Sequence, residues 1–302
     1  MAGRPQAYGR DGARGTRRSA LSRRALLTTA LGTAAGTLAA AAPLYEARRS
    51  PAGGTASAAV RGSGGTPPDQ EACPSWPRPF RPDFPPAGLV TNEYAYRRPD
   101  AADARTSADW QVTSGSLFAR RGCGWTGVPD GEAPGPDSRE HTGSAVFRLV
   151  GRRRDFGDAT VRCWVLLDRP VTTARTPAVD WDGGHLWLRY HGPQELYALS
   201  FRRRDGAVVL KRKHPAAGRT GGTEGEYTTL AEGRHALPYG RWHQVTAAVR
   251  TVAEDTVRLR LALNGRTVLD AEDRAPGRLV APGGVGLRGD NTEMRFAHFS
   301  AQ

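Results

Sequence analysis

The sequence contains little lysine, cysteine or methionine. Only Lys211 and Lys213 are lysines, and the 302 residues include three cysteines and two methionines. No two cysteines have the Cys-x-x-Cys spacing and no cysteine and histidine pattern has the spacing of a zinc site, so the sequence does not indicate a zinc-stabilised fold. The mean hydropathy of −0.53 excludes a protein that crosses a membrane several times. The chain is instead rich in glycine and positive charge, with 37 glycines and a formal net charge of +13.

The positive charge is unevenly distributed along the chain. Residues 1–24 hold seven arginines against one aspartate, whereas residues 88–302 are only mildly basic. The basic residues do not gather in one segment with interleaved aromatic residues, which is the pattern typical of nucleic-acid binding. Nearly all of them are arginine, a bias that a GC-rich genome produces without any functional demand. We therefore expect no nucleic-acid partner.

The N-terminal leader has the order of an export signal. Ser22-Arg23-Arg24-Ala25-Leu26-Leu27 follows a basic segment and opens a weakly apolar stretch, residues 25–42. This order resembles a twin-arginine signal and predicts export by the twin-arginine machinery to the cell envelope or the outside. Ala40-Ala41-Ala42 offers small residues for cleavage, although Pro43 would follow the cut, and retention of residues 1–47 as a membrane anchor is the alternative. A chance arginine pair in an arginine-rich chain is the remaining interpretation.

Residues 48–87 are rich in proline and glycine. Such a segment buries too little apolar surface to form a core of its own, so we expect a disordered linker there. One folded domain is then expected over residues 88–302, starting near Leu89.

The three cysteines allow one intramolecular disulfide in an oxidising compartment. Cys163 shares one face of a predicted strand with Val161 and Val165, which indicates a small buried residue. Cys73 and Cys123 lie in irregular glycine- and proline-rich segments, and we predict that they form the disulfide. The alternative is that all three cysteines stay reduced.

Apolar and polar residues alternate through residues 89–300, with no amphipathic helix of ten residues or more. The clearest run, 256–263, ends at Asn264-Gly265, a pair typical of a two-residue hairpin because both residues accept a positive φ. Further strands are expected at 115–119, 144–150, 159–167, 184–190, 195–202, 206–212, 226–230, 242–250, 267–269, 284–288 and 294–300. About a dozen antiparallel strands without covering helices predict an all-β sandwich of two sheets.

Several motifs occur in the order found in one family. They are the central run 184–190, Gly240-Arg241-Trp242-His243-Gln244-Val245, the run 283–288 and Phe296-Ala297-His298-Phe299. Together with the hairpin they resemble the concanavalin A-like lectin/glucanase jelly roll, and within it the laminin-G-like domains of secreted bacterial proteins. The resemblance covers residues 89–300 and implies a two-sheet jelly-roll sandwich. The superfamily includes endoglucanases, polysaccharide lyases and non-catalytic sugar-binding modules, so the fold does not decide the function.

The catalytic patterns of the family's enzymes are missing. Retaining glucanases of this fold carry Glu-x-Asp-x-x-Glu on one strand, because two carboxylates must flank the scissile bond. The nearest candidates are Asp180 and Asp182, or Glu224 and Glu226, and both pairs are also typical of turns. A lyase would need a tyrosine or histidine base and a cation for the uronate carboxylate, and the usual lyase strands are absent. Hydrolase and lyase remain the enzymatic alternatives.

A polar strand face favours sugar binding without cleavage. His185, Trp187, Arg189 and His191 alternate onto one side of the predicted strand 184–190 and its end, and Arg202 extends the same sheet face from the next strand. The indole of Trp187 offers a flat apolar surface for a pyranose ring, and the basic side chains can bind hydroxyls or a carboxylate. We therefore predict a polysaccharide ligand, with an acidic one suggested by the arginines. A structural spacer domain without a glycan ligand is the second alternative.

The resemblance also raises the question of a structural calcium ion, which many members hold near the last strand. Asp290, Asn291 and Glu293 could supply oxygen ligands, but Ala297-His298 stands where the resemblance leads one to expect an aspartate. Gly289-Asp290-Asn291 is equally typical of a plain turn. We expect no other cofactor, and we expect a monomer.

Overall fold

The computed structural model describes residues 79–130, 145–174, 176–216 and 225–302. All of these belong to one compact unit, Gln70–Gln302. The predicted export signal, most of the predicted linker and Cys73 lie outside the described residues. No helix in the described ranges is long and apolar enough to span a membrane.

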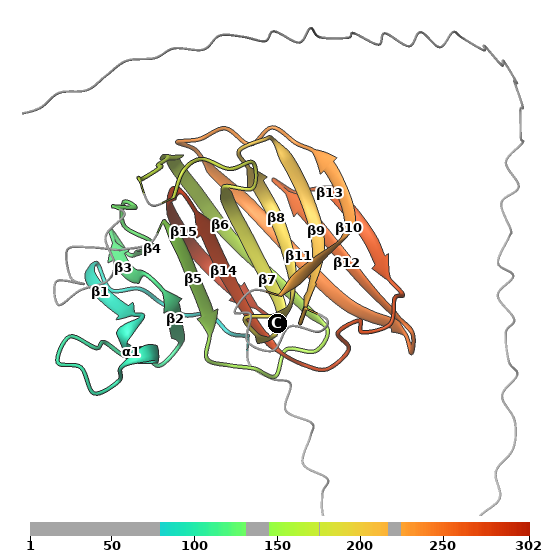
Figure 1. Ribbon diagram of the computed structural model, residues 1–302, viewed down its shortest axis with the longest axis horizontal. Helices are drawn as coiled ribbons and strands as arrows, with labels where there is room; N and C mark the ends of the chain where they lie inside the picture. The colour runs from blue at the N-terminus through green and yellow to red at the C-terminus, as the bar shows by residue number, and fades with distance from the viewer. Residues whose placement is uncertain (1–78, 131–144, 175, 217–224) are drawn as a thin grey trace, which may run out of the picture. The chain divides into compact units, whose positions relative to one another are not determined.

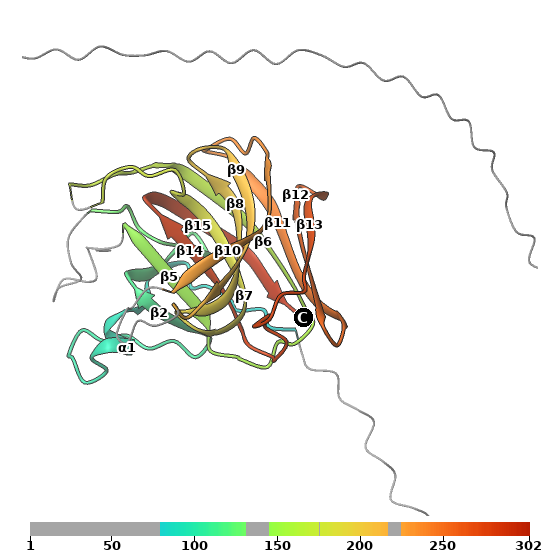
Figure 2. The same cartoon turned by 45° about the vertical axis from the view of Figure 1, so that its right-hand side comes forward.

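Two antiparallel sheets pack face to face (Figures 1 and 2), which confirms the predicted all-β sandwich. In spatial order, the eight-stranded sheet contains β1 (Ala87–Asn92), β3 (Ser116–Arg120), β4 (Cys123–Trp125), β15 (Thr292–Ala301), β6 (Ala159–Pro170), β11 (Trp242–Ala253), β12 (Thr256–Leu263) and β13 (Arg266–Asp273). The seven-stranded sheet contains β10 (Glu226–Arg234), β9 (Ala207–His214), β8 (Glu195–Arg203), β7 (Gly183–Gly192), β14 (Gly284–Asp290), β5 (Val146–Gly151) and β2 (Trp110–Ser114). Within the described ranges the only helix is the single turn α1 (Tyr94–Arg97).

The chain repeatedly crosses between the sheets, as a jelly roll does. Consecutive strands β5, β6 and β7 alternate between the two sheets, and so do β14 and β15. As a result β14 lies between β5 and β7, and β15 lies between β4 and β6. Each of these neighbours is far away in sequence, so the centre of the fold is built from long-range pairs.

The predicted hairpin is present between β12 and β13. Asn264 and Gly265 form its turn with φ values of 50° and 81°. Gly265 takes the left-handed conformation without steric strain, and asparagine tolerates it better than most residues do. The turn therefore sets the strand pairing in which Leu261 faces Leu269.

Alternating side chains from both sheets form the core. On β6 the inward positions include Val161, Cys163 and Val165, all essentially inaccessible to solvent. The prediction that Cys163 is a buried strand residue is confirmed, and burial raises the pKa of its thiol to about 12. Leu186 and Leu188 of β7 enter the same core from the opposite sheet.

Two aromatic residues before the predicted boundary at residue 88 pack against the core. Phe80 exchanges two backbone hydrogen bonds with Ala301, of 2.8 and 2.9 Å, and its ring packs in the core. Phe84 packs against the same core. These aromatic residues are embedded in a proline-rich context, which is why composition assigned them to the linker. Cys123 is partly buried, and its predicted disulfide with Cys73 stays a prediction.

Candidate functional site

A cavity of about 440 Å³ lies on the face of the seven-stranded sheet that points away from the core, which we call the outer face. Strand alternation explains its position. Because Leu186 and Leu188 point into the core, Trp187 between them points to the outer face. The cavity is lined by Arg148, Trp181, His185, Trp187, Ala198, Ser200, Arg203, Lys211, Gly225, Tyr227, Arg288 and Asp290.

Aromatic rings form the floor and the rim of this cavity. Trp187 lies at the floor, is only 3% exposed and stacks on Tyr190 with ring centroids 5.5 Å apart. Gly286 lies directly beside it, and a Cβ atom there would come within 3.3 Å of the indole. At the rim, Trp181 is 53% exposed and Tyr227 is 40% exposed. The most accessible flat apolar surface therefore belongs to Trp181, in the turn before β7, and not to the predicted Trp187.

A buried polar chain runs beside the floor of the cavity. His185 Nδ1 lies 2.8 Å from Ser200 Oγ on the neighbouring strand, and His185 Nε2 lies 3.1 Å from Asp290 Oδ2 on β14. Arg288 donates from Nε to both carboxylate oxygens of Asp290, at 3.0 and 2.8 Å. Strand pairing explains the grouping, because His185 faces Ser200 on one side and Arg288 on the other.

Burial and the neighbouring charges have opposite effects on the pKa values of Asp290 and His185. Burial by itself would raise the pKa of Asp290, but Arg288 and His185 outweigh it and hold that pKa below its ordinary value. Burial lowers the pKa of His185 below its ordinary value of 6.5, although Asp290 acts in the opposite direction. The site thus contains a carboxylate that stays ionised and an imidazole that stays neutral near pH 7.

This arrangement makes stability depend on pH. Between the folded pKa of His185 and 6.5, the unfolded chain binds a proton that the folded chain does not bind, so stability falls as the pH falls. The slope from this one group is at most about 1.4 kcal/mol per pH unit. Urea unfolding at pH 7.0 and pH 5.5 should show this loss in the wild type and a smaller loss in His185→Gln. An identical loss in both proteins would contradict the assignment. Asp290 does not affect this comparison, because its pKa lies below 3.8 in the folded protein and its protonation lowers stability only below that pH.

Arg189 departs from the predicted alternation. Its φ of 46° and a break in the β7–β8 register between Leu188 and Gly192 turn it away from the outer face. The side chain is 1% exposed and donates hydrogen bonds to Leu279 O, Gly157 O, Asp158 Oδ1 and Thr251 Oγ1. Arg189 therefore joins strands and loops around the end of the sandwich and does not line the cavity.

His191 and Arg202 also lie outside the cavity lining. His191 Nε2 lies 3.2 and 3.1 Å from the carbonyl oxygens of Ala281 and Pro282. Arg202 donates from Nε to Leu237 O at 2.9 Å, and its guanidinium lies over the ring of Tyr239.

A register irregularity explains the placement of Arg202. Gly184 pairs with Arg202 while His185 pairs with Ser200, so one extra residue stands on β8. Beyond this irregularity it is Arg203, and not Arg202, that lines the cavity. Of the five predicted ligand-binding residues, His185 and Trp187 lie together in the cavity.

The two catalytic candidates, Asp180 and Asp182, differ in burial. Asp182 is buried and accepts hydrogen bonds from Val179 N, Arg204 Nε and Asn291 Nδ2 at 2.9–3.0 Å. Asp180 is exposed in the adjacent turn. These contacts are those of turn-forming residues, the alternative that the sequence left open.

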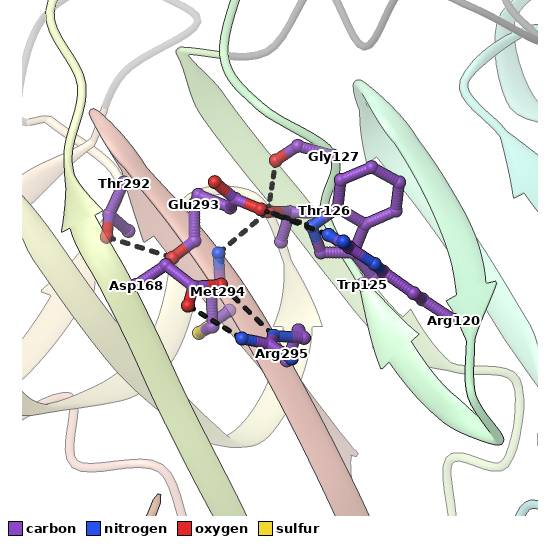
Figure 3. A network of polar contacts seen from close by, with 9 residues as sticks. All are labelled: Arg120, Trp125, Thr126, Gly127, Asp168, Thr292, Glu293, Met294 and Arg295. Atoms are coloured by element: carbon purple, nitrogen blue, oxygen red, sulfur yellow. Dashed lines mark hydrogen bonds and ion pairs between the residues drawn. The ribbon is translucent and has the colours of Figure 1, made fainter. Parts of the chain in front are cut away.

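The three candidate calcium ligands have separate partners. Asp290 contacts His185 and Arg288, and Asn291 contacts Asp182. Glu293 accepts a hydrogen bond from Trp125 Nε1 at 3.0 Å and lies 3.7 Å from Arg120 Nη1. Figure 3 shows Trp125 and Arg120 beside its carboxylate. The described residues contain no group of three acidic, histidine or cysteine side chains placed to hold a metal ion.

Sequence reasoning missed most of the charged lining. The lining residues that it did not include among the predicted ligand-binding residues are Arg148, Trp181, Arg203, Lys211, Tyr227 and Arg288. One signal was available for Lys211, which alternates with the buried Leu210 and is one of only two lysines in the chain. Alternation alone could not show that Arg203 lies in the same cavity, because one extra residue on β8 brings Arg203 there.

Comparisons with known proteins give structural similarity at low sequence identity. No family model matches this chain, and no curated protein matches it. The chain is similar to the carbohydrate binding module CBM66 from Bacillus subtilis, with 14% identity, 64% of this chain and 94% of that chain covered, and a TM-score of 0.43. It is also similar to the metal-free carbohydrate recognition domain of Emp46p, with 10% identity, 70% and 94% covered, and a TM-score of 0.42. A third similar structure is the alginate lyase Aly36B, with 10% identity, 76% of this chain and 98% of that chain covered, and a TM-score of 0.40.

Proposed function

We propose that this protein is an exported polysaccharide-binding protein whose ligand occupies the cavity on the outer face. The observation that carries the proposal is the exposed indole of Trp181 beside a cavity with an aromatic floor and many hydrogen-bonding side chains. A pyranose ring has apolar faces and a rim of hydroxyl groups, so it matches a flat ring surrounded by polar groups.

The cavity favours binding over hydrolysis. Cleavage of a glycosidic bond by the usual mechanism needs two carboxyl groups, one on each side of the bond. Among the described residues that line the cavity, Asp290 is the only acid. Arg288 and His185 already contact its carboxylate, and the side chain is buried. A single carboxylate held in this way is a structural anion and a poor general acid.

Removing the exposed indole should abolish most of the binding. We expect Trp181→Ala to weaken polysaccharide binding at least tenfold, because the ring supplies the accessible stacking surface. Isothermal titration calorimetry of the full chain against a panel of soluble neutral and acidic polysaccharides measures this change. The same samples should be assayed for reducing ends and unsaturated products.

The matched control is Trp164→Ala. Trp164 is 40% exposed on β6, in the opposite sheet, and does not line the cavity. We expect this variant to bind like the wild type. An equal loss of affinity in both variants would refute the cavity as the binding site. Release of sugar products would identify an enzyme. No binding of any polysaccharide would favour a structural spacer.

A further inference from the structure

The cavity on the outer face holds an excess of positive charge. Its lining contains four basic side chains, Arg148, Arg203, Lys211 and Arg288, and among the described lining residues the one acid is Asp290. The carboxylate of Asp290 is 2.8 Å from Arg288 Nε and 3.1 Å from His185 Nε2, so its charge is compensated by groups beside it.

Strand pairing forces two of these cations together. Arg148 of β5 and Arg288 of β14 stand directly opposite one another in the antiparallel pair. Side chains of directly paired residues lie on the same face of the sheet, and like charges in that position repel. The fold therefore places two guanidinium groups on one side of the cavity, and Asp290 contacts one of them, that of Arg288.

Lys211 and Arg203 form a second cationic pair on β9 and β8. Lys211 is partly buried, its ammonium lies 5.7 Å from the ring centroid of Tyr227, and no ion pair joins it to an acid among the described residues. Burial and, after it, the charge of Arg203 lower the pKa of Lys211, while the carboxylates of Glu232 and Asp205 act in the opposite direction. Arg203 donates from Nη2 to Asp205 Oδ2 at 2.6 Å, but its buried Nε has no hydrogen-bond partner among the described residues.

These two features describe a site for an anion. An unpartnered N–H and a partly buried ammonium group without an ion pair, both inside one cavity, are costly to bury when no negative group contacts them. Carboxylates and sulfates accept charge-assisted hydrogen bonds from lysine and arginine, which are stronger than bonds to neutral hydroxyls. A neutral sugar would offer these two groups no negative charge to bind.

We propose that the polysaccharide is anionic and that Lys211 and Arg203 bind its carboxylate or sulfate group. This inference rests on the proposed function, since it specifies the chemical class of the ligand in the same cavity. Trp181 supplies the stacking surface for the sugar ring, and the two cations select the charged substituent.

The test compares charge variants on defined glycans. Full-length wild type, Lys211→Gln and Arg203→Gln are titrated at 0.15 M salt with alginate, with dextran sulfate and with neutral dextran. We expect the wild type to prefer an anionic glycan over dextran at least tenfold, and each variant to lose at least tenfold in affinity for it. The comparison of alginate with dextran sulfate decides between carboxylate and sulfate.

Three controls keep the result interpretable. Arg250→Gln changes the net charge equally on the exposed part of the opposite sheet and should bind like the wild type. Lys211→Arg keeps the charge and should retain most of the affinity, which separates loss of charge from loss of fold. Trp181→Ala should weaken binding to every glycan that the wild type binds.

The two proposals fail in different ways. If Trp181→Ala loses binding while Lys211→Gln and Arg203→Gln bind like the wild type, the anionic inference is wrong and the proposed function stands. If the wild type binds dextran and both anionic glycans with equal affinity, the anionic inference is likewise wrong and the proposed function stands. Equal affinity for a single-stranded DNA oligonucleotide and the anionic glycans would also overturn the inference, and absence of binding to any glycan would overturn both proposals.

Discussion

Asp273→Asn is expected to lower the free energy of unfolding by about 3–5 kcal/mol. Asp273 is 1% exposed at the end of β13, and its carboxylate accepts hydrogen bonds from Arg212 Nη1 at 3.0 Å and from Tyr197 Oη at 2.8 Å. The Tyr197 oxygen in turn accepts a hydrogen bond from Leu279 N at 3.0 Å. The substitution leaves the buried guanidinium of Arg212 without its counter-charge, and that is the source of the large effect.

This cluster joins the two sheets. Tyr197 and Arg212 belong to β8 and β9 of the seven-stranded sheet, whereas Asp273 belongs to the eight-stranded one. Burial raises the pKa of Tyr197, so its hydroxyl remains a donor at neutral pH. Loss of the cluster should therefore loosen the end of the sandwich as well as lower its stability.

The double variant Arg212→Met, Asp273→Asn is the control for the first prediction. Removing both charges removes the uncompensated guanidinium, so the double variant should be more stable than Asp273→Asn alone. Chemical denaturation of the four proteins in the cycle measures the coupling. Additive losses from the two single substitutions would contradict a coupled buried pair.

Trp110→Ala should destabilise the protein by about 3–5 kcal/mol as well. Trp110 is 1% exposed, and the rings of Phe80, Phe84, Phe296 and Phe299 surround it at centroid distances of 5.1–6.4 Å. Removing the indole leaves a cavity in this aromatic cluster and also removes the contacts that hold Phe80 and Phe84 against the core. Thermal and urea unfolding measure the loss.

Trp110→Phe is the matched variant for this site. The indole nitrogen of Trp110 has no hydrogen-bond partner among the described residues. A phenyl ring therefore keeps most of the edge-to-face contacts and gives up no hydrogen bond. We expect a loss well below that of Trp110→Ala, and equal losses would show that the cluster depends on the indole itself.

The segment around Phe80 and Phe84 shows where composition misleads. Proline and glycine dominate residues 48–87, and composition averages over a few aromatic residues within such a stretch. In the structure those two rings lie against Trp110, because single side chains of an irregular segment can pack into a core. Phe80 and Phe84 therefore pack with the core, although composition places them in the linker.

The sequence by itself determined which residues form strands and which of their side chains point inward. Alternation with a period of two identified the core positions of β6 and β12, including Cys163, and Asn264-Gly265 identified the hairpin. These features depend on neighbours in sequence, so local patterns carry them.

Only the tertiary structure decided which polar side chains meet. A positive φ turns Arg189 inward, and one extra residue on β8 places Arg203 in the cavity instead of Arg202, because a single-residue shift changes which face a side chain occupies. Lys211, Arg288 and Trp181 come from separate segments and gather only through strand pairing. The cavity therefore results from long-range pairing, which strand alternation does not specify.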